Sequence, residues 1–216
     1  MTELRQQLID SARRMSVLGL NRGTAGNVSV RAGDESDEAC SAFLITPTGM
    51  AYDTLEPEDI VRMRLDGTCT GRRKPSSEWR FHRDLYVARA DAGAILHAHS
   101  PFATSLACLR RDIPPFHYMI ARFGGDTIRC ADYAIFGSAE LSTAAMQAMA
   151  GRKGCLLANH GLLVAGGDLA EAFALAVELE ELCEQYWRAC QLGHPVLLTP
   201  GEMRAVLERF RGYGQQ

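Results

Sequence analysis

The sequence lacks the features of several large protein classes. None of its 216 residues belongs to an apolar run of 18, and the first 20 include Glu3, Arg5 and Asp10, so we expect neither a membrane span nor a secretion signal. Basic residues are scattered and the net charge is -3, which disfavours nucleic acid and anionic lipid as partners. The seven cysteines contain no C-x-x-C pair, which favours reduced core thiols over disulfides or a thiolate zinc site. These absences predict a cytoplasmic protein.

The motifs of three common enzyme classes are also missing. There is no Gly-x-Ser-x-Gly, no P-loop and no dinucleotide fingerprint in the right context, which disfavours serine hydrolases, nucleotide hydrolases and dehydrogenases. What is present is 47% hydrophobic residues without a linker rich in Pro, Gly or Ser, which predicts one domain over residues 1–216. A chain of this size buries roughly 70% of its unfolded surface, so its core needs no metal and any metal ion is free to be catalytic.

Apolar periodicity predicts an α/β domain. Leu4, Leu8 and Ala12 follow helical spacing behind Thr2, a plausible N-cap, and the helix should end near Gly19. Short apolar or alternating runs bounded by Gly, Pro and Asp predict strands at 28–30, 43–45, 60–65, 94–99 and 155–158. Further helices are predicted at 76–89, 138–150, 169–190 and 201–211, the last two with capping boxes at Asp168-x-x-Glu171 and Thr199-x-x-Glu202.

Histidine spacing provides candidate metal ligands. His97 and His99 lie two residues apart in a predicted strand, where side chains i and i+2 share a face, so both imidazoles can reach one point. His160 follows another predicted strand, and Gly161 would let the chain turn sharply and leave this histidine at the strand end. Each histidine alone is more simply a loop or strand-end residue. Together, three histidines would leave the fourth position of a tetrahedral Zn²⁺ open for substrate, which favours an enzyme.

Three turns rich in small polar residues are candidate anion sites. They are NRGTAGN at 21–27, TPTG at 46–49 and KPSSE at 74–78, where backbone N–H groups and hydroxyls can close on a phosphate. Each is unremarkable alone, and the sequence does not show that they converge. If they do, one phosphorylated substrate would be held at one end and activated by metal at the other.

The last turn also begins a predicted helix. Ser76 or Ser77 is expected to cap it. Glu78 in its first turn would either interact favourably with the helix dipole or take part in the catalytic reaction. His82, four residues further, either packs or supports Glu78. Tyr118 and Tyr213 lie near Pro- or Gly-rich segments and are candidate acids, although isolated tyrosines more often pack with a wet hydroxyl.

Six stretches together resemble a known family. LGLNRGTAGNVSVR, LITPTGM, KPSSEWRFH, HAHS, HYMIA and NHGLLV occur in this order before a Tyr-Gly tail, and from about Leu8 to Tyr213 they resemble the class II aldolase/adducin family, most of all its aldolases for L-fuculose 1-phosphate. The resemblance implies an α/β/α fold with a central, mainly antiparallel sheet, assembled as a C4 homotetramer. It implies one Zn²⁺ per subunit, with Mn²⁺ or Co²⁺ as alternatives. The implied reaction cleaves a ketose 1-phosphate, such as L-fuculose 1-phosphate, to dihydroxyacetone phosphate and an aldehyde.

The resemblance also implies a role for each matching residue. His97, His99 and His160 match the zinc histidines, and Glu78 matches a carboxylate that binds the resting metal and then acts as acid and base. Tyr118 matches a tyrosine that reaches in from a neighbouring subunit to exchange a proton with the aldehyde oxygen. Tyr213 matches a tail tyrosine that closes over the substrate. The phosphate-binding residues are matched by Thr24, Asn27, Thr48, Gly49, Ser76 and Ser77.

Departures from the family pattern leave the identity of the aldehyde product undetermined. Ala98 replaces an Asn between the paired histidines, Asn159 replaces a histidine, and the loop at 32–41 is longer. The first alternative substrates are therefore 5-deoxyribulose 1-phosphate and 5-methylthioribulose 1-phosphate. The family's epimerases carry Asp in place of Glu78 and its decarboxylases tend to carry Ser-Lys-Glu, so Ser-Ser-Glu favours an aldolase. Adducin-like scaffolds lose metal ligands, and the three histidines argue against that reading.

Overall fold

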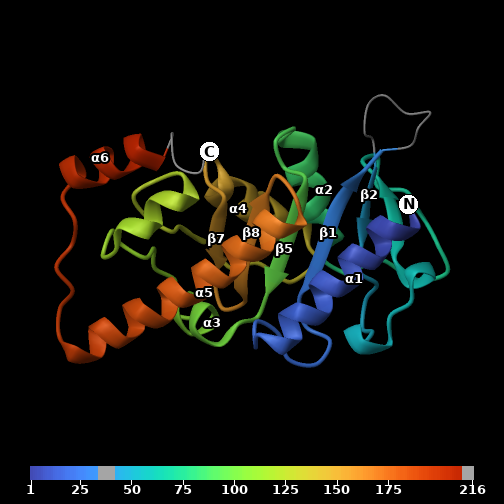
Figure 1. Cartoon of the computed structure of the whole chain (residues 1–216), viewed down its shortest axis with the longest axis horizontal. Helices are drawn as coiled ribbons and strands as arrows, with labels where there is room; N and C mark the ends of the chain where they lie inside the picture. The colour runs from blue at the N-terminus through green and yellow to red at the C-terminus, as the bar shows by residue number, and fades with distance from the viewer. Residues whose placement is uncertain (34–41, 211–216) are drawn as a thin grey trace.

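One mixed sheet organises the computed structural model, which describes residues 1–33 and 42–210 (Figure 1). Within that part of the chain the sheet has eight strands in the order β4-β3-β2-β1-β5-β8-β7-β6. Only the β6–β7 pair is parallel among the described strands, and the other neighbours are antiparallel. The predicted α/β class with a mainly antiparallel central sheet is confirmed. Residues 34–41 of the loop at 32–41, and Tyr213, lie outside the described residues.

The bounds of the elements follow the chain. The strands are β1 (Asn27–Ala32), β2 (Ala42–Ile45), β3 (Val61–Arg64), β4 (Cys69–Thr70), β5 (Ala94–Ala98), β6 (Cys130–Ala131), β7 (Gly154–Leu157) and β8 (Gly161–Gly166). The α-helices are α1 (Thr2–Val17), α2 (Trp79–Ala88), α3 (Pro101–Ala107), α4 (Ala139–Met149), α5 (Leu169–Leu192) and α6 (Pro200–Phe210). Three short 3₁₀ helices are η1 (Tyr52–Thr54), η2 (Pro57–Asp59) and η3 (Tyr118–Phe123).

Two helical layers cover the two faces of the sheet. Helices α1 and α5 cross the face nearer the viewer in Figure 1, and α2 and α4 lie behind. Because strand side chains alternate, Leu96 and Leu162 join the core under α1 and α5, whereas Ile95 and Leu163 join the core under α2 and α4. Both faces are therefore buried, so the central strands read as nearly continuous apolar runs.

The structure corrects several sequence predictions. Helix α1 begins at Thr2 itself, with Met1 as an N-cap that makes no side-chain hydrogen bond. Strands β4, β6 and β8 and helix α3 were not predicted. No disulfide joins the cysteines in the described ranges, but Cys69, Cys108 and Cys190 are exposed rather than core thiols. None of the helices described here combines the length and apolarity needed to cross a membrane.

Candidate active site

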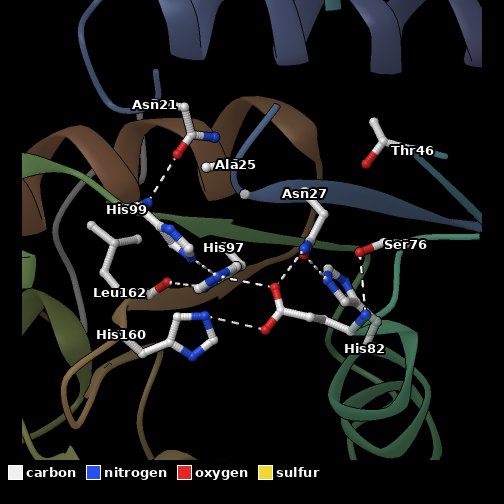
Figure 2. Close-up of polar contacts among 12 residues, drawn as sticks. Asn21, Ala25, Asn27, Thr46, Ser76, His82, His97, His99, His160 and Leu162 are labelled. Atoms are coloured by element: carbon white, nitrogen blue, oxygen red, sulfur yellow. Dashed lines mark hydrogen bonds and ion pairs between the residues drawn. The ribbon is translucent and has the colours of Figure 1, made fainter. Parts of the chain in front are cut away.

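The end of β5 carries the paired histidines. His97 is the fourth of its five residues and is fully buried, and His99 follows the last one, Ala98. The backbone N–H of His99 donates to Oδ1 of the buried Asn21 (2.9 Å), which fixes the chain as it leaves the strand. The Nε2 atoms of the two histidines lie 2.9 Å apart, so the predicted convergence of this pair is confirmed (Figure 2).

His160 reaches the same point from the turn between β7 and β8. Strand β8 pairs with β5, so this turn lies beside the end that carries His97 and His99, and the His160 ring centroid is 4.7 Å from that of His97. The residue with positive φ in the turn is Asn159 (φ 53°), so the prediction that Gly161 makes the turn was wrong. Gly161 instead opens β8, where a Cβ would lie 2.3 Å from the carbonyl oxygen of Ala98.

Glu78 enters the cluster from the start of α2. The helix begins at Trp79 with Glu78 as N-cap, later than predicted, and neither Ser76 nor Ser77 is its N-cap. The reason is that the preceding segment is held extended: Pro75 forms a bridge with Pro47, and the Ser76 N–H donates to the carbonyl of Thr46. The Glu78 side chain lies against His97 and His160.

The Glu78 carboxylate is held in its ionised form. Its Oε2 lies 3.2 Å from Nε2 of His97 and accepts a hydrogen bond from Nδ2 of Asn27 (3.0 Å), and its Oε1 lies 3.2 Å from Nε2 of His160 (Figure 2). Burial alone would raise the pKa of this carboxyl, but the charge and hydrogen bond of His97, with His160 and Asn27, hold the pKa well below its usual range. Glu78 is therefore an anion inside the protein, facing three imidazoles.

All three histidines turn Nε2 toward this carboxylate or toward one another. Nδ1 of His97 lies 2.8 Å from the carbonyl oxygen of Leu162 and donates its hydrogen there, so Nε2 is left as the metal-binding nitrogen when the ring is neutral. Burial, reinforced by repulsion from His97, lowers the pKa of His99 to about 4 and that of His160 to about 3. Both rings are therefore neutral near pH 7, as ligands to a metal ion must be.

These four side chains fit a divalent metal ion. One atom from each of Glu78, His97, His99 and His160 lies within 4.8 Å of the others, and Oε1 of Glu78 is buried with no hydrogen-bond donor among the described residues. Tetrahedral ligands with bonds of about 2.0–2.1 Å to Zn²⁺ lie roughly 3.3 Å from one another. The distances of 2.9 and 3.2 Å between the ligand atoms match this spacing, and three nitrogens with one oxygen suit zinc chemically.

A pocket of about 170 Å³ opens beside the metal-binding group. The three predicted turns meet there, which the sequence alone did not show. Glu78, His99 and Phe136 also line it, and Phe136 was not singled out from the sequence. Gly26 is required in the first turn because a Cβ there would lie 2.7 Å from the carbonyl oxygen of His97, at φ 72°. All six predicted phosphate-binding residues line this pocket: Thr24, Asn27, Thr48, Gly49, Ser76 and Ser77.

Of the two predicted tyrosines, the structure describes only Tyr118. Tyr118 begins η3, is 51% exposed and does not line the pocket within one chain. Tyr213 lies outside the described residues. Asn159, which stands where the family pattern has a histidine, accepts a hydrogen bond from Nε of Arg110 (2.6 Å) on the surface.

Glu180 on α5 supports the site from outside, and the sequence did not predict it. Its carboxylate accepts hydrogen bonds from the hydroxyl of Ser100 (2.6 Å) and from the backbone N–H groups of Phe102 and Ala103 (both 2.8 Å). Ser100 occupies the N-cap position of α3 but makes no capping bond itself. Glu180 therefore caps α3 across 80 residues of sequence, directly after His99.

Comparison with known proteins agrees with this geometry. Residues 6–187 match the family model described as the class II aldolase and adducin N-terminal domain. A 5-methylthioribulose-1-phosphate/5-deoxyribulose-1-phosphate aldolase of Rhodospirillum rubrum is 55% identical over 211 residues, covering 98% of this chain and 92% of the relative. The L-fuculose phosphate aldolase of Escherichia coli is 44% identical, covering 98% and 96%. A solved L-fuculose 1-phosphate aldolase superposes with a TM-score of 0.91 at 40% identity, covering 98% and 97%.

Proposed function

The chain belongs to the class II aldolase and adducin family, and from this premise we propose that it cleaves a ketose 1-phosphate into dihydroxyacetone phosphate and an aldehyde. It is a class II aldolase with a group of residues that could hold a metal ion. The observation that carries the proposal is the pocket in which Glu78 and His99 stand next to the three small-residue turns. One phosphorylated substrate could occupy both ends.

Zinc is the proposed metal, with Mn²⁺ or Co²⁺ as alternatives. His97, His99 and His160 would hold it, with Glu78 as a further ligand in the resting enzyme. When bound, the ion supplies a Lewis acid that polarises substrate oxygens and stabilises the negative charge left as the carbon–carbon bond breaks. No lysine Schiff base is required by this scheme.

The chain's own residues would bind the phosphate and move the protons. Thr24, Thr48, Ser76 and Ser77 offer hydroxyls, and the turn around Gly49 offers backbone N–H groups, as expected of a phosphate cradle. Asn27 lines the same pocket, but its amide is engaged with Glu78.

Glu78, once it leaves the metal, would return a proton to the carbon of the three-carbon fragment. Tyr118 would accept the proton of the C4 hydroxyl. The Tyr118 side chain is 51% exposed in one chain, which agrees with the proposed homotetramer of fourfold (C4) symmetry, in which Tyr118 would serve the active site of the neighbouring subunit. Tyr213 would close over the substrate.

A short apolar tail is the proposed feature of the aldehyde half. We favour 5-methylthioribulose 1-phosphate and 5-deoxyribulose 1-phosphate because the relative that acts on them is 55% identical, against 44% for the fuculose phosphate enzyme. Phe136, the large apolar side chain in the pocket wall, suits such a tail. L-Fuculose 1-phosphate is the second candidate, supported by the TM-score of 0.91. The chain would work in the cytoplasm as a single domain over residues 1–216.

A panel of ketose 1-phosphates, scored by release of dihydroxyacetone phosphate, tests this proposal. We expect cleavage of more than one 5-deoxy sugar, since a pocket gains only about 1–3 kcal/mol per methylene and discriminates weakly between similar tails. The matched unphosphorylated ketoses should be cleaved far more slowly. Equal kcat/KM for the phosphorylated and unphosphorylated forms of one sugar would contradict the proposed phosphate-binding residues. Epimerisation without cleavage would contradict the proposed aldolase reaction.

A further inference from the structure

A ladder of buried polar side chains runs from the active site into the protein between β1 and α2. Strand β1 contributes Asn27 and Ser29, two residues apart on the face that looks toward α2, and α2 contributes His82 and Tyr86, four residues apart. The registers match because four helical residues rise about 6 Å and two strand residues rise about 6.6 Å. Such a ladder is costly to bury, so each member must be hydrogen-bonded.

The hydrogen bonds link the ladder to Glu78. Nε2 of His82 lies 2.5 Å from Oδ1 of Asn27, and Nδ1 of His82 lies 2.7 Å from the hydroxyl of Ser29. The Ser29 hydroxyl is 2.8 Å from the hydroxyl of Tyr86, and Asn27 Nδ2 donates to Glu78. His82 and Ser29 are fully buried and Asn27 and Tyr86 are 2% exposed, so the polar groups of these side chains form hydrogen bonds with one another instead of with water.

The direction of every donor follows from the charge at one end. An ionised carboxylate only accepts, so Asn27 must turn its NH₂ group toward Glu78 and its oxygen toward His82. His82 must then carry its hydrogen on Nε2. Its ring touches only uncharged partners in the ladder, and burial lowers its pKa to about 3, so Nδ1 is bare and accepts from Ser29. Ser29 in turn accepts from Tyr86.

From this geometry we infer that His82 is a positioning residue. Ser29 and Tyr86 hold it as the neutral Nε2–H tautomer. In this form His82 orients the amide of Asn27 so that Glu78 always receives a hydrogen bond on Oε2. The inference rests on the proposed role of Glu78 in proton transfer. Without the His82 donor, the Asn27 amide could rotate and place its oxygen against the carboxylate. His82 touches neither the metal-binding point nor the pocket, so it acts through Asn27 alone.

Three substitutions at one position separate hydrogen bonding from packing. His82→Gln places an amide donor near the position of Nε2, His82→Asn can offer one only near Nδ1, and His82→Phe offers none while keeping a ring beside Phe81, on which His82 stacks. We expect His82→Phe and His82→Asn to lower kcat about 10- to 100-fold in the zinc-loaded enzyme with little change in KM. Losses of this size are common when a residue that hydrogen-bonds to the groups around a metal is replaced. His82→Gln should recover most of the loss.

A spectroscopic measurement tests the tautomer without reference to activity. Solid-state ¹⁵N NMR of zinc-loaded protein labelled only in its six histidine rings, compared with the His82→Gln variant, identifies the two His82 signals. We expect one protonated Nε2 and one bare Nδ1 at pH 7. An Nδ1–H tautomer or an imidazolium would overturn the inference, as would equal kcat values for His82→Gln and His82→Phe. A wild-type enzyme that cleaves no ketose phosphate would refute the proposed function instead, while the spectrum would still decide the tautomer.

Discussion

The cap that Glu180 places on α3 makes a quantitative prediction. Replacing Glu180 by Ala removes three hydrogen bonds of 2.6–2.8 Å to one carboxylate and leaves the N–H groups of Phe102 and Ala103 without this partner. An N-cap is worth about 0.5–2 kcal/mol and a hydrogen bond to a charged group about 1.5–3 kcal/mol. Because the three bonds share one carboxylate and water replaces part of them, we expect a loss of about 3 kcal/mol in the free energy of unfolding.

The assay is urea unfolding of metal-free protein at one fixed protein concentration, so that metal binding and subunit association do not alter the comparison. Glu181→Ala is the matched control, because Glu181 lies next along α5, is exposed and accepts an exposed hydrogen bond from Gln185 (3.2 Å). The control should change stability by less than about 0.5 kcal/mol. If Glu180→Ala behaves like this control, the proposed cap contributes nothing and the reasoning is refuted.

The same variant should also weaken the site. Ser100, which donates to Glu180, directly follows the candidate ligand His99. Loosening the first turn of α3 should therefore reduce zinc affinity about 10- to 100-fold, as expected when support for a ligand is lost. Unchanged zinc affinity in Glu180→Ala, despite reduced stability, would show that the cap serves folding alone.

Three further outcomes follow from the site. His160→Ala should lose most bound metal while its circular dichroism stays that of the wild type, and a near-normal metal content would remove it from the ligand set. Glu78→Gln should keep metal on the histidines but slow exchange of dihydroxyacetone phosphate protons with deuterium by about 100-fold or more; wild-type exchange would rule out its proton transfer. Because burial lowers the pKa of His82 from 6.5 to about 3, the unfolded state alone binds a proton between these values. Metal-free protein should therefore lose about 1.4 kcal/mol of stability per pH unit from this residue as pH falls below 6.5, and His82→Gln should flatten that slope in urea unfolding at several pH values.

Local patterns were sufficient to predict that the paired histidines converge. His97 and His99 share a strand face by the two-residue period, and a single strand fixes their relative positions, so no long-range information was needed. The pairing of β5 with β8 then determines where His160 lies, and that pairing was absent from the prediction because β8 was not predicted. The strand and turn pattern made His160 a candidate third ligand, and the resemblance to the family then matched it to that role.

Contacts between distant segments escaped prediction for a physical reason. Glu180 is one of several acidic residues on α5, and nothing in its local sequence distinguishes the one that meets α3 from those that face solvent. Asn27 and Ser29 alternate with valines, a pattern that predicts a strand with one solvent-exposed face. Both are nevertheless buried because α2 supplies polar partners. The late start of α2 likewise depends on the bridge from Pro75 to Pro47, which lies 28 residues earlier.

Metal dependence of the cleavage tests the central claim most directly. The protein would be stripped with a chelator, titrated with zinc, and assayed for dihydroxyacetone phosphate released from 5-methylthioribulose 1-phosphate. The four candidate ligands converge on one point, so activity should be absent without metal and should rise linearly until one zinc is bound per chain. Full activity in the stripped protein, or zinc bound at one per chain with no cleavage of any ketose 1-phosphate, would contradict the account.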